Sequence, residues 1–117
     1  MKRDIDLIKE ILIQIEKSNQ VKGWINIQIP GRSSKEVYYH IKLLHEAGLI
    51  EAVNQSTKSG FMWVAKSLTW NGHEFLDAAR NDTVWENLKN KVKEHGGNVP
   101  FYVVKDLLVQ ISKDLIK

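Results

Sequence analysis

One helix in this sequence has both of its ends marked, and it constrains the fold more than any other feature. Ser33 stands three residues before Glu36, so its oxygen can accept a backbone N–H while the glutamate reaches back to the cap. Gly48 stands where a left-handed C-terminal cap belongs. We therefore predict a helix over residues 34–47. Apolar residues at helical spacing form its inner face: Val37, Ile41 and Leu44.

Strand signals flank this helix on both sides. Residues 24–29 alternate isoleucine with polar residues, a period of two that is typical of a short strand with one buried face. Pro30-Gly31 then predicts a turn. After the helix, apolar runs at 49–53 and 61–67 enclose a polar loop, which predicts a β-hairpin with a long tip.

The remaining segments have helical periodicity. An amphipathic helix is expected from about residue 5 to 18, with Asp4 and Asp6 in its first turn. Further along the chain, three residues mark helix starts: Thr69, Asp82 and Pro100. Gly96-Gly97 ends the helix that Asp82 begins. The sequence thus predicts an α+β fold in which helices come before and after one hairpin along the chain.

Composition narrows the function classes. The 117 residues contain no cysteine, which excludes disulfides, thiolate nucleophiles and iron–sulfur clusters. No apolar run approaches the roughly 18 residues that span a bilayer, and the N-terminus does not resemble a signal peptide. We expect a soluble cytoplasmic protein with no membrane partner.

Two motifs carry a family resemblance. Residues 37–50, which include Leu44-His45-Glu46-Ala47-Gly48-Leu49-Ile50, resemble the recognition helix and first wing strand of winged-helix transcription factors. Residues 68–76, with Leu68-Thr69 and Gly72, are similar to the start of the helix that follows the wing. The opening residues 1–8 and the turn at 96–101 resemble small uncharacterised winged-helix proteins of bacteria and their phages, the YjcQ-like group.

This resemblance implies a fold but brings no established activity. We expect a winged-helix domain over residues 1–80 and a C-terminal helical extension over 81–117, packed on it as one compact unit. Residues 19–32 depart from the pattern, because a standard winged helix has a further helix just before the recognition helix. Here the segment has no helical period, so that helix is either short or absent.

The function that the resemblance implies is DNA binding in transcriptional regulation, without enzymatic activity. The outer face of the helix at 34–47 would then meet the major groove, and the hairpin tip would reach the backbone. The candidate DNA-binding residues are Arg32, Ser34, Lys35, Tyr38, Tyr39, Lys42, Lys58 and Ser59. Residues 21–67 hold six basic and three acidic side chains of a chain with net charge +3.

Other interpretations of these residues, without DNA binding, stay open. The lysines can be an ordinary solvated face, the tip can be a mobile polar loop, and a winged helix can bind another protein instead of DNA. The tryptophans are expected in packing, although exposed ones would mark a partner surface: Trp24, Trp63, Trp70 and Trp85. His40 and His45 are five residues apart, the wrong spacing for a metal pair, so we expect no metal and no cofactor.

The last helix carries a broad apolar stripe. Its members recur at heptad spacing: Phe101, Val104, Leu108, Ile111 and Leu115. The stripe can pack back on the first helix of the chain, or it can pair with a second copy across a two-fold axis. We therefore consider a homodimer through this helix as one possibility.

Overall fold

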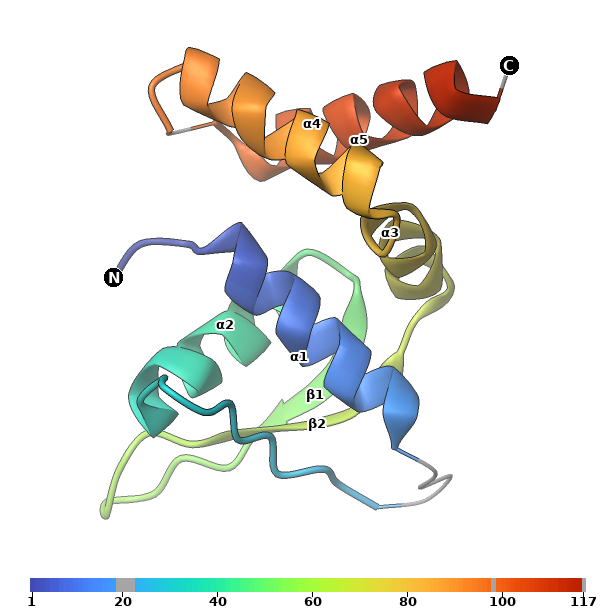
Figure 1. The fold of residues 1–117 in the computed structure, drawn as a ribbon. Coiled ribbons are helices and arrows are strands. Elements are labelled where there is room, and N and C mark those ends of the chain that lie inside the picture. Colours follow the sequence, from blue (N-terminus) through green and yellow to red (C-terminus); the bar gives the residue numbers. More distant parts are fainter. Residues whose placement is uncertain (19–22, 98, 117) are drawn as a thin grey trace. The chain divides into compact units, whose positions relative to one another are not determined.

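The computed structural model describes residues 1–18, 23–97 and 99–116 (Figure 1). The elements are α1 (Ile5–Lys17), α2 (Ser34–Glu46), β1 (Ile50–Asn54), β2 (Trp63–Leu68), α3 (Trp70–Ala79), α4 (Asp82–Glu94) and α5 (Phe101–Ile116). The predicted α+β class is confirmed, and the order is compatible with a small winged-helix-like fold.

The chain divides into two compact units, an N-terminal unit (Met1–His73) and a C-terminal unit (Glu74–Lys117). The division lies inside α3, whereas the sequence predicted it after this helix, at residue 80. Packing of the C-terminal extension on the rest of the chain stays a prediction.

The predicted caps form at both ends of α2, but among the described residues the Glu36 side chain pairs with Arg32 and does not reach back to Ser33. Ser33 Oγ accepts from the N–H of Glu36 at 3.1 Å. At the other end, Gly48 has φ +77 and donates to the carbonyl of His45, while the N–H of Leu49 donates to Leu44. This pair of bonds is a Schellman motif, which reverses the chain into β1.

The hairpin is antiparallel, and its register places Ile50 opposite Leu68, with an irregularity between Glu51 and Ala52. The strand predicted at 24–29 is reduced to a single bridge, in which Ile25 and Ala65 exchange N–H···O bonds of 2.6 and 3.1 Å. Residues 26–29 are outside any strand.

A side chain takes the place of a strand partner along this segment. Gln14 of α1 donates from Nε2 to the Gln28 carbonyl at 3.1 Å and accepts from the Gln28 N–H at 3.3 Å. The predicted alternation still holds, since Ile27 and Ile29 are buried and Gln28 is exposed. Across residues 23–33 the chain forms no helix, so in this part of the segment the further helix of a standard winged helix is absent.

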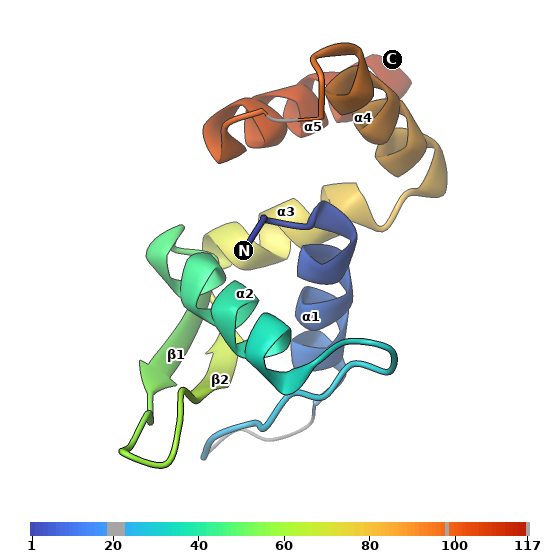
Figure 2. The same ribbon diagram turned by 90° about the vertical axis from the view of Figure 1, so that its left-hand side faces the viewer.

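In the N-terminal unit, α1 packs against α2 and β2, and α2 packs against both strands (Figure 2). Buried apolar side chains of these elements include Leu7, Ile8, Ile11, Leu12, Val37, Ile41, Leu44, Ile50 and Val64. The phase predicted for α2 is therefore confirmed. Asp4 is the N-cap of α1 and not a first-turn residue, because its carboxylate accepts from the amides of Asp6 and Leu7.

The base of the hairpin is joined to α3 by a short set of contacts. The N–H of Thr69 donates to the Leu49 carbonyl at 3.0 Å, and its hydroxyl donates to the Gly48 carbonyl at 2.6 Å. The same hydroxyl oxygen accepts from the N–H of Gly72 at 3.1 Å, which caps α3 as predicted. A Cβ at position 72 would overlap the Leu49 carbonyl oxygen, so only glycine fits there.

In the C-terminal unit, α4 and α5 pack against each other (Figure 1). The cap of α4 is Asn81 and not Asp82, because Asn81 Oδ1 accepts from the Val84 N–H at 3.1 Å. The helix ends at Gly96 and Gly97, both with positive φ, as the sequence predicts.

Candidate nucleic-acid interface

Five of the eight predicted DNA-binding residues lie on α2, away from its buried face. Ser34 and Lys35 are exposed in the first turn, and Tyr38, Tyr39 and Lys42 are half-buried further along. The opposite side of the helix is the buried face described above. This arrangement leaves one side of α2 open to solvent.

The hairpin tip (residues 55–62) lies on the same side of the N-terminal unit as the start of α2, the lower side in both views (Figures 1 and 2). This follows from the chain path, because β1 reverses direction after the C-terminal end of α2. Lys58 and Ser59 are the central residues of a turn in which Thr57 and Gly60 exchange N–H···O bonds of 3.0 Å.

The tip is held together by side-chain hydrogen bonds. Ser56 Oγ accepts from the Met62 N–H at 2.9 Å, and the Thr57 hydroxyl accepts from the Ser59 N–H at 3.1 Å. Asn54 Oδ1 accepts from the Ser56 N–H at 2.9 Å. These hydrogen bonds fix the conformation of the backbone that carries Lys58.

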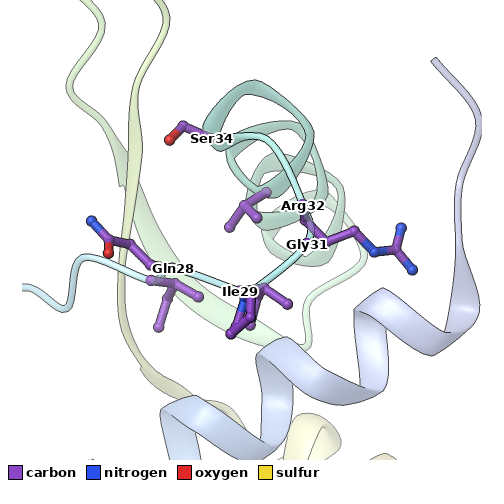
Figure 3. A pocket seen from close by; sticks show the side chains of 8 residues that line it. Gln28, Ile29, Gly31, Arg32 and Ser34 are labelled. Carbon is purple, nitrogen blue, oxygen red and sulfur yellow. The ribbon is translucent and has the colours of Figure 1, made fainter.

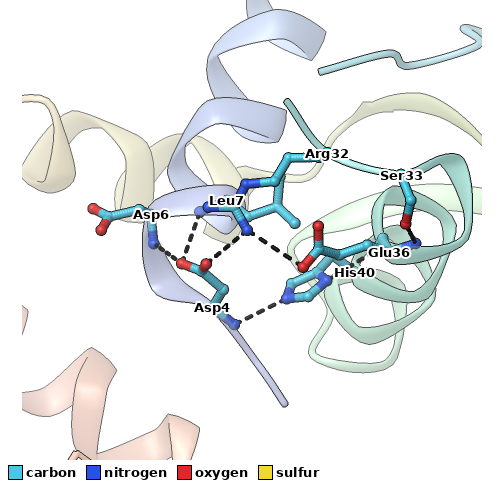
Figure 4. Close-up of polar contacts among 7 residues, drawn as sticks. All are labelled: Asp4, Asp6, Leu7, Arg32, Ser33, Glu36 and His40. Carbon is cyan, nitrogen blue, oxygen red and sulfur yellow. Dashed lines mark hydrogen bonds and ion pairs between the residues drawn. The ribbon is translucent and has the colours of Figure 1, made fainter. Parts of the chain in front are cut away.

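Arg32 has a different environment from the one predicted. Its Nη1 lies 2.8 Å from Asp4 Oδ2 and 3.4 Å from Glu36 Oε2 (Figure 4). Desolvation raises the pKa of Asp4, but the hydrogen bond and charge of Arg32 and the amides of Leu7 and Asp6 outweigh it, so the net pKa is lowered. The hydrogen bond to Asp4 is the largest cause that raises the pKa of Arg32.

His40 links α2 to the start of α1. The ring is fully buried, and the Asp4 N–H donates to Nε2 at 2.9 Å. Nδ1 lies 2.9 Å from the Glu36 carbonyl oxygen, which can only accept. The two partners together require the neutral ring with its proton on Nδ1.

A cavity of about 520 Å³ opens beside the start of α2 (Figure 3). Its buried apolar side chains are Ile27, Ile29 and Val37, and Ser34 lies at its edge. In the same view the guanidinium of Arg32 points toward the N-terminal end of α1. The surface that the cavity presents is more polar than apolar, and it includes the first turn of α2.

Three lysines remain for an anionic partner on this face. Lys42 Nζ is 4.0 Å from Glu46 Oε2, a weak pairing within the helix. Lys35 and Lys58 make no ion pair with the part of the chain that the structure describes. The cationic surface is thus small, and Arg32 belongs to a carboxylate network instead.

The tryptophans divide into two pairs. Trp63 and Trp85 are buried, as expected, while Trp24 is 46% exposed and Trp70 is 79% exposed. Phe61 at the hairpin tip is 40% exposed. The N-terminal unit therefore displays aromatic surface in addition to its lysines.

The stripe proposed as a dimer interface is largely used within the chain. Val104, Leu108 and Ile111 are buried, and the Phe101 ring centroid is 5.6 Å from that of Phe75. Leu115 is 47% exposed. Dimerisation through α5 stays a prediction.

The described residues hold neither a metal-binding group nor a membrane-spanning helix. Across 1–18, 23–97 and 99–116, no group of three His, Asp or Glu side chains could hold a metal ion. In the same ranges, no helix has the length and apolar character needed to cross a membrane.

Comparison with known proteins places the chain in a family without a described activity. The family described as "Hypothetical protein (DUF2513)" matches residues 2–98. An "Uncharacterized protein" of Haemophilus influenzae is 38% identical over 117 residues, which are 99% of each chain. No solved structure matches significantly. These matches confirm the expected likeness to small uncharacterised bacterial proteins. The family that matches is DUF2513, whereas the sequence motifs resembled the YjcQ-like group.

Proposed function

This chain belongs to the DUF2513 family, and we propose that its N-terminal unit is a winged-helix module that binds double-stranded DNA in transcriptional regulation. In this proposal α2 is the recognition helix, and the hairpin of β1 and β2 is the wing. The outer face of α2 enters the major groove, and the wing tip follows the neighbouring phosphate backbone.

The observation that carries the proposal is the hydrogen-bonded hairpin tip on the side where α2 begins. It holds Lys58 at the centre of a turn, while Lys35 lies in the first turn of α2. First-turn amides of a helix favour a phosphate through the helix dipole. Two cations and a helix start on one side of a small unit suit a polyanion better than a neutral partner.

The number of available lysines sets the expected salt dependence of duplex binding. Each phosphate contact contributes about −0.9 to the slope of log K against log salt. Lys35, Lys42 and Lys58 would together give a slope of about −2.7 for one copy of the chain. Between about 50 and about 200 mM salt, the affinity should then fall roughly 40-fold.

The absence of a helix within residues 23–33 changes how α2 can be presented. In a standard winged helix that element crosses the backbone beside the recognition helix. Here the start of α2 is preceded by a turn with the Arg32 N–H bonded to the Ile29 carbonyl at 3.1 Å, and Gly31 has φ +81. The duplex would therefore meet this turn and the wing on either side of α2.

The test is fluorescence anisotropy with a random-sequence duplex over a range of salt concentrations. Lys35→Ala and Lys58→Ala should each weaken binding to every duplex alike and should reduce the salt slope by about one. Lys93→Ala, in α4, is the matched control and should leave the slope unchanged. A wild-type protein that shows no duplex affinity at about 50 mM salt would exclude the proposal.

The second candidate is a winged-helix module that binds another protein and no DNA. The exposed aromatic rings of Trp24, Phe61 and Trp70 favour it, because large aromatic residues are enriched at protein interfaces. Replacing Trp70 with Ser should leave duplex binding unchanged if DNA is the partner of the α2 face. Absence of duplex binding by the wild-type protein would promote this candidate.

A further inference from the structure

Four residues join the start of α1 to the start of α2, and we call Asp4, Arg32, Glu36 and His40 the clamp (Figure 4). Asp4 is engaged on three sides. Its Oδ1 caps α1, its Oδ2 pairs with Arg32 at 2.8 Å, and its N–H donates to buried His40 at 2.9 Å. One residue of the sequence therefore ties both helices together.

The clamp lies at the start of α2, where the preceding segment is a turn. The turn after Pro30 leads directly to Arg32, and α2 begins two residues later. No helix braces this end of α2 within residues 23–33. The contacts from Asp4 to Arg32 and His40 hold α2 at its start and near its middle.

The charges around Arg32 argue against a phosphate contact. Its side chain is 26% exposed, and its Nη1 lies between the carboxylates of Asp4 and Glu36. A phosphate would have to compete with both, and the three groups together carry a net charge of −1. An arginine that left them would also expose two carboxylates to the DNA backbone, where they would repel it.

We propose that Asp4 and Arg32 are positioning residues, which set the start of α2 for the duplex in place of a helix that residues 23–33 do not form, and that Arg32 does not contact phosphate. The proposal rests on the DNA binding proposed above. It reassigns Arg32, which the sequence alone grouped with the phosphate-binding lysines.

Asp4→Asn separates the two roles of Asp4. Asparagine keeps the oxygen that caps α1 and is as good an N-cap as aspartate. It keeps the backbone N–H that reaches His40, but it replaces the oxygen that pairs with Arg32 by an NH₂ group. The variant should therefore remain folded while losing only the ion pair.

Measuring duplex binding by variants of Asp4 and Arg32 distinguishes an Arg32 that positions α2 from an Arg32 that contacts phosphate. If Arg32 positions α2, Asp4→Asn and Arg32→Gln should both weaken binding about fivefold at every salt concentration and leave the salt slope unchanged. If Arg32 contacts phosphate, Arg32→Gln should reduce the slope by about one, and Asp4→Asn should tighten binding by releasing the guanidinium. Either of these last two results would overturn the proposal. Arg80→Gln, an arginine 3.7 Å from Asp77 in the C-terminal unit, is the control.

Amide hydrogen exchange tests the clamp without DNA. The Val37 N–H, which donates to the Ser33 carbonyl at 3.1 Å, should exchange about tenfold faster in Asp4→Asn, while β1 and β2 amides keep their rates. Unchanged exchange at Val37 would show that the ion pair does not hold α2, and it would overturn the proposal. Faster exchange in a protein without duplex affinity would overturn the proposed function and with it the positioning of α2 for DNA.

Discussion

Replacing Gly72 with alanine tests the contact between the hairpin base and α3. Gly72 lies in the first turn of α3, and its φ is not in the left-handed region, so an alanine backbone is allowed there. Helix propensity alone therefore predicts that Gly72→Ala stabilises the protein by about 1 kcal/mol. The structure predicts the opposite sign.

The magnitude follows from what the new methyl group would meet. It would overlap the Leu49 carbonyl oxygen and lie 3.0 Å from the Leu49 carbonyl carbon. Both are backbone atoms, so the strand or the helix must shift, which costs about 1–3 kcal/mol for overpacking. The shift also strains the bond from the Thr69 N–H to Leu49, worth about 1 kcal/mol. After the gain in propensity, the net destabilisation should be about 2 kcal/mol.

Urea denaturation followed by circular dichroism measures this difference in the free energy of unfolding. Asn71→Ala is the matched control, because Asn71 is exposed one position earlier in the same turn. Its effect should stay within about 0.5 kcal/mol. A Gly72→Ala protein that is as stable as the wild type, or more stable, would refute the close approach of α3 to Leu49.

Two further predictions concern the start and phase of α2 and the clamp. Leu44→Ala should lower the free energy of unfolding by about 2–5 kcal/mol because it leaves a cavity. Ser33→Ala should lower it by about 1 kcal/mol because the cap of α2 is lost. An unchanged melting temperature for Leu44→Ala would mean that residue 44 is not on the buried face of α2. The lowered pKa of Asp4 means that its ion pair stabilises the fold above about pH 4 and that this stabilisation is lost as the pH falls through the folded-state pKa. The difference in unfolding free energy between wild type and Asp4→Asn should therefore shrink as the pH is lowered from about 5 to about 2, and a difference that is constant over this range would contradict the ion pair.

Features that depend on neighbouring residues could be predicted from the sequence. The Ser33 cap and the Gly48 termination of α2 are local, since each requires a side chain or a backbone angle within a few residues. The buried face of α2 follows from a repeat of 3.6 residues, and the hairpin follows from two apolar runs around a polar tip. The spacing of His40 and His45 could be read from the sequence, but the burial of His40 could not.

Features that join distant residues were decided by the tertiary structure. Nothing near Arg32 in the sequence indicates Asp4 as its partner, and the first-turn position predicted for Asp4 reveals neither its cap nor the oxygen that binds the guanidinium. The strand expected at 24–29 is reduced to one bridge because Gln14, on another element, bonds the Gln28 backbone. A side chain has one local propensity but several possible long-range partners, and only the packed chain selects among them.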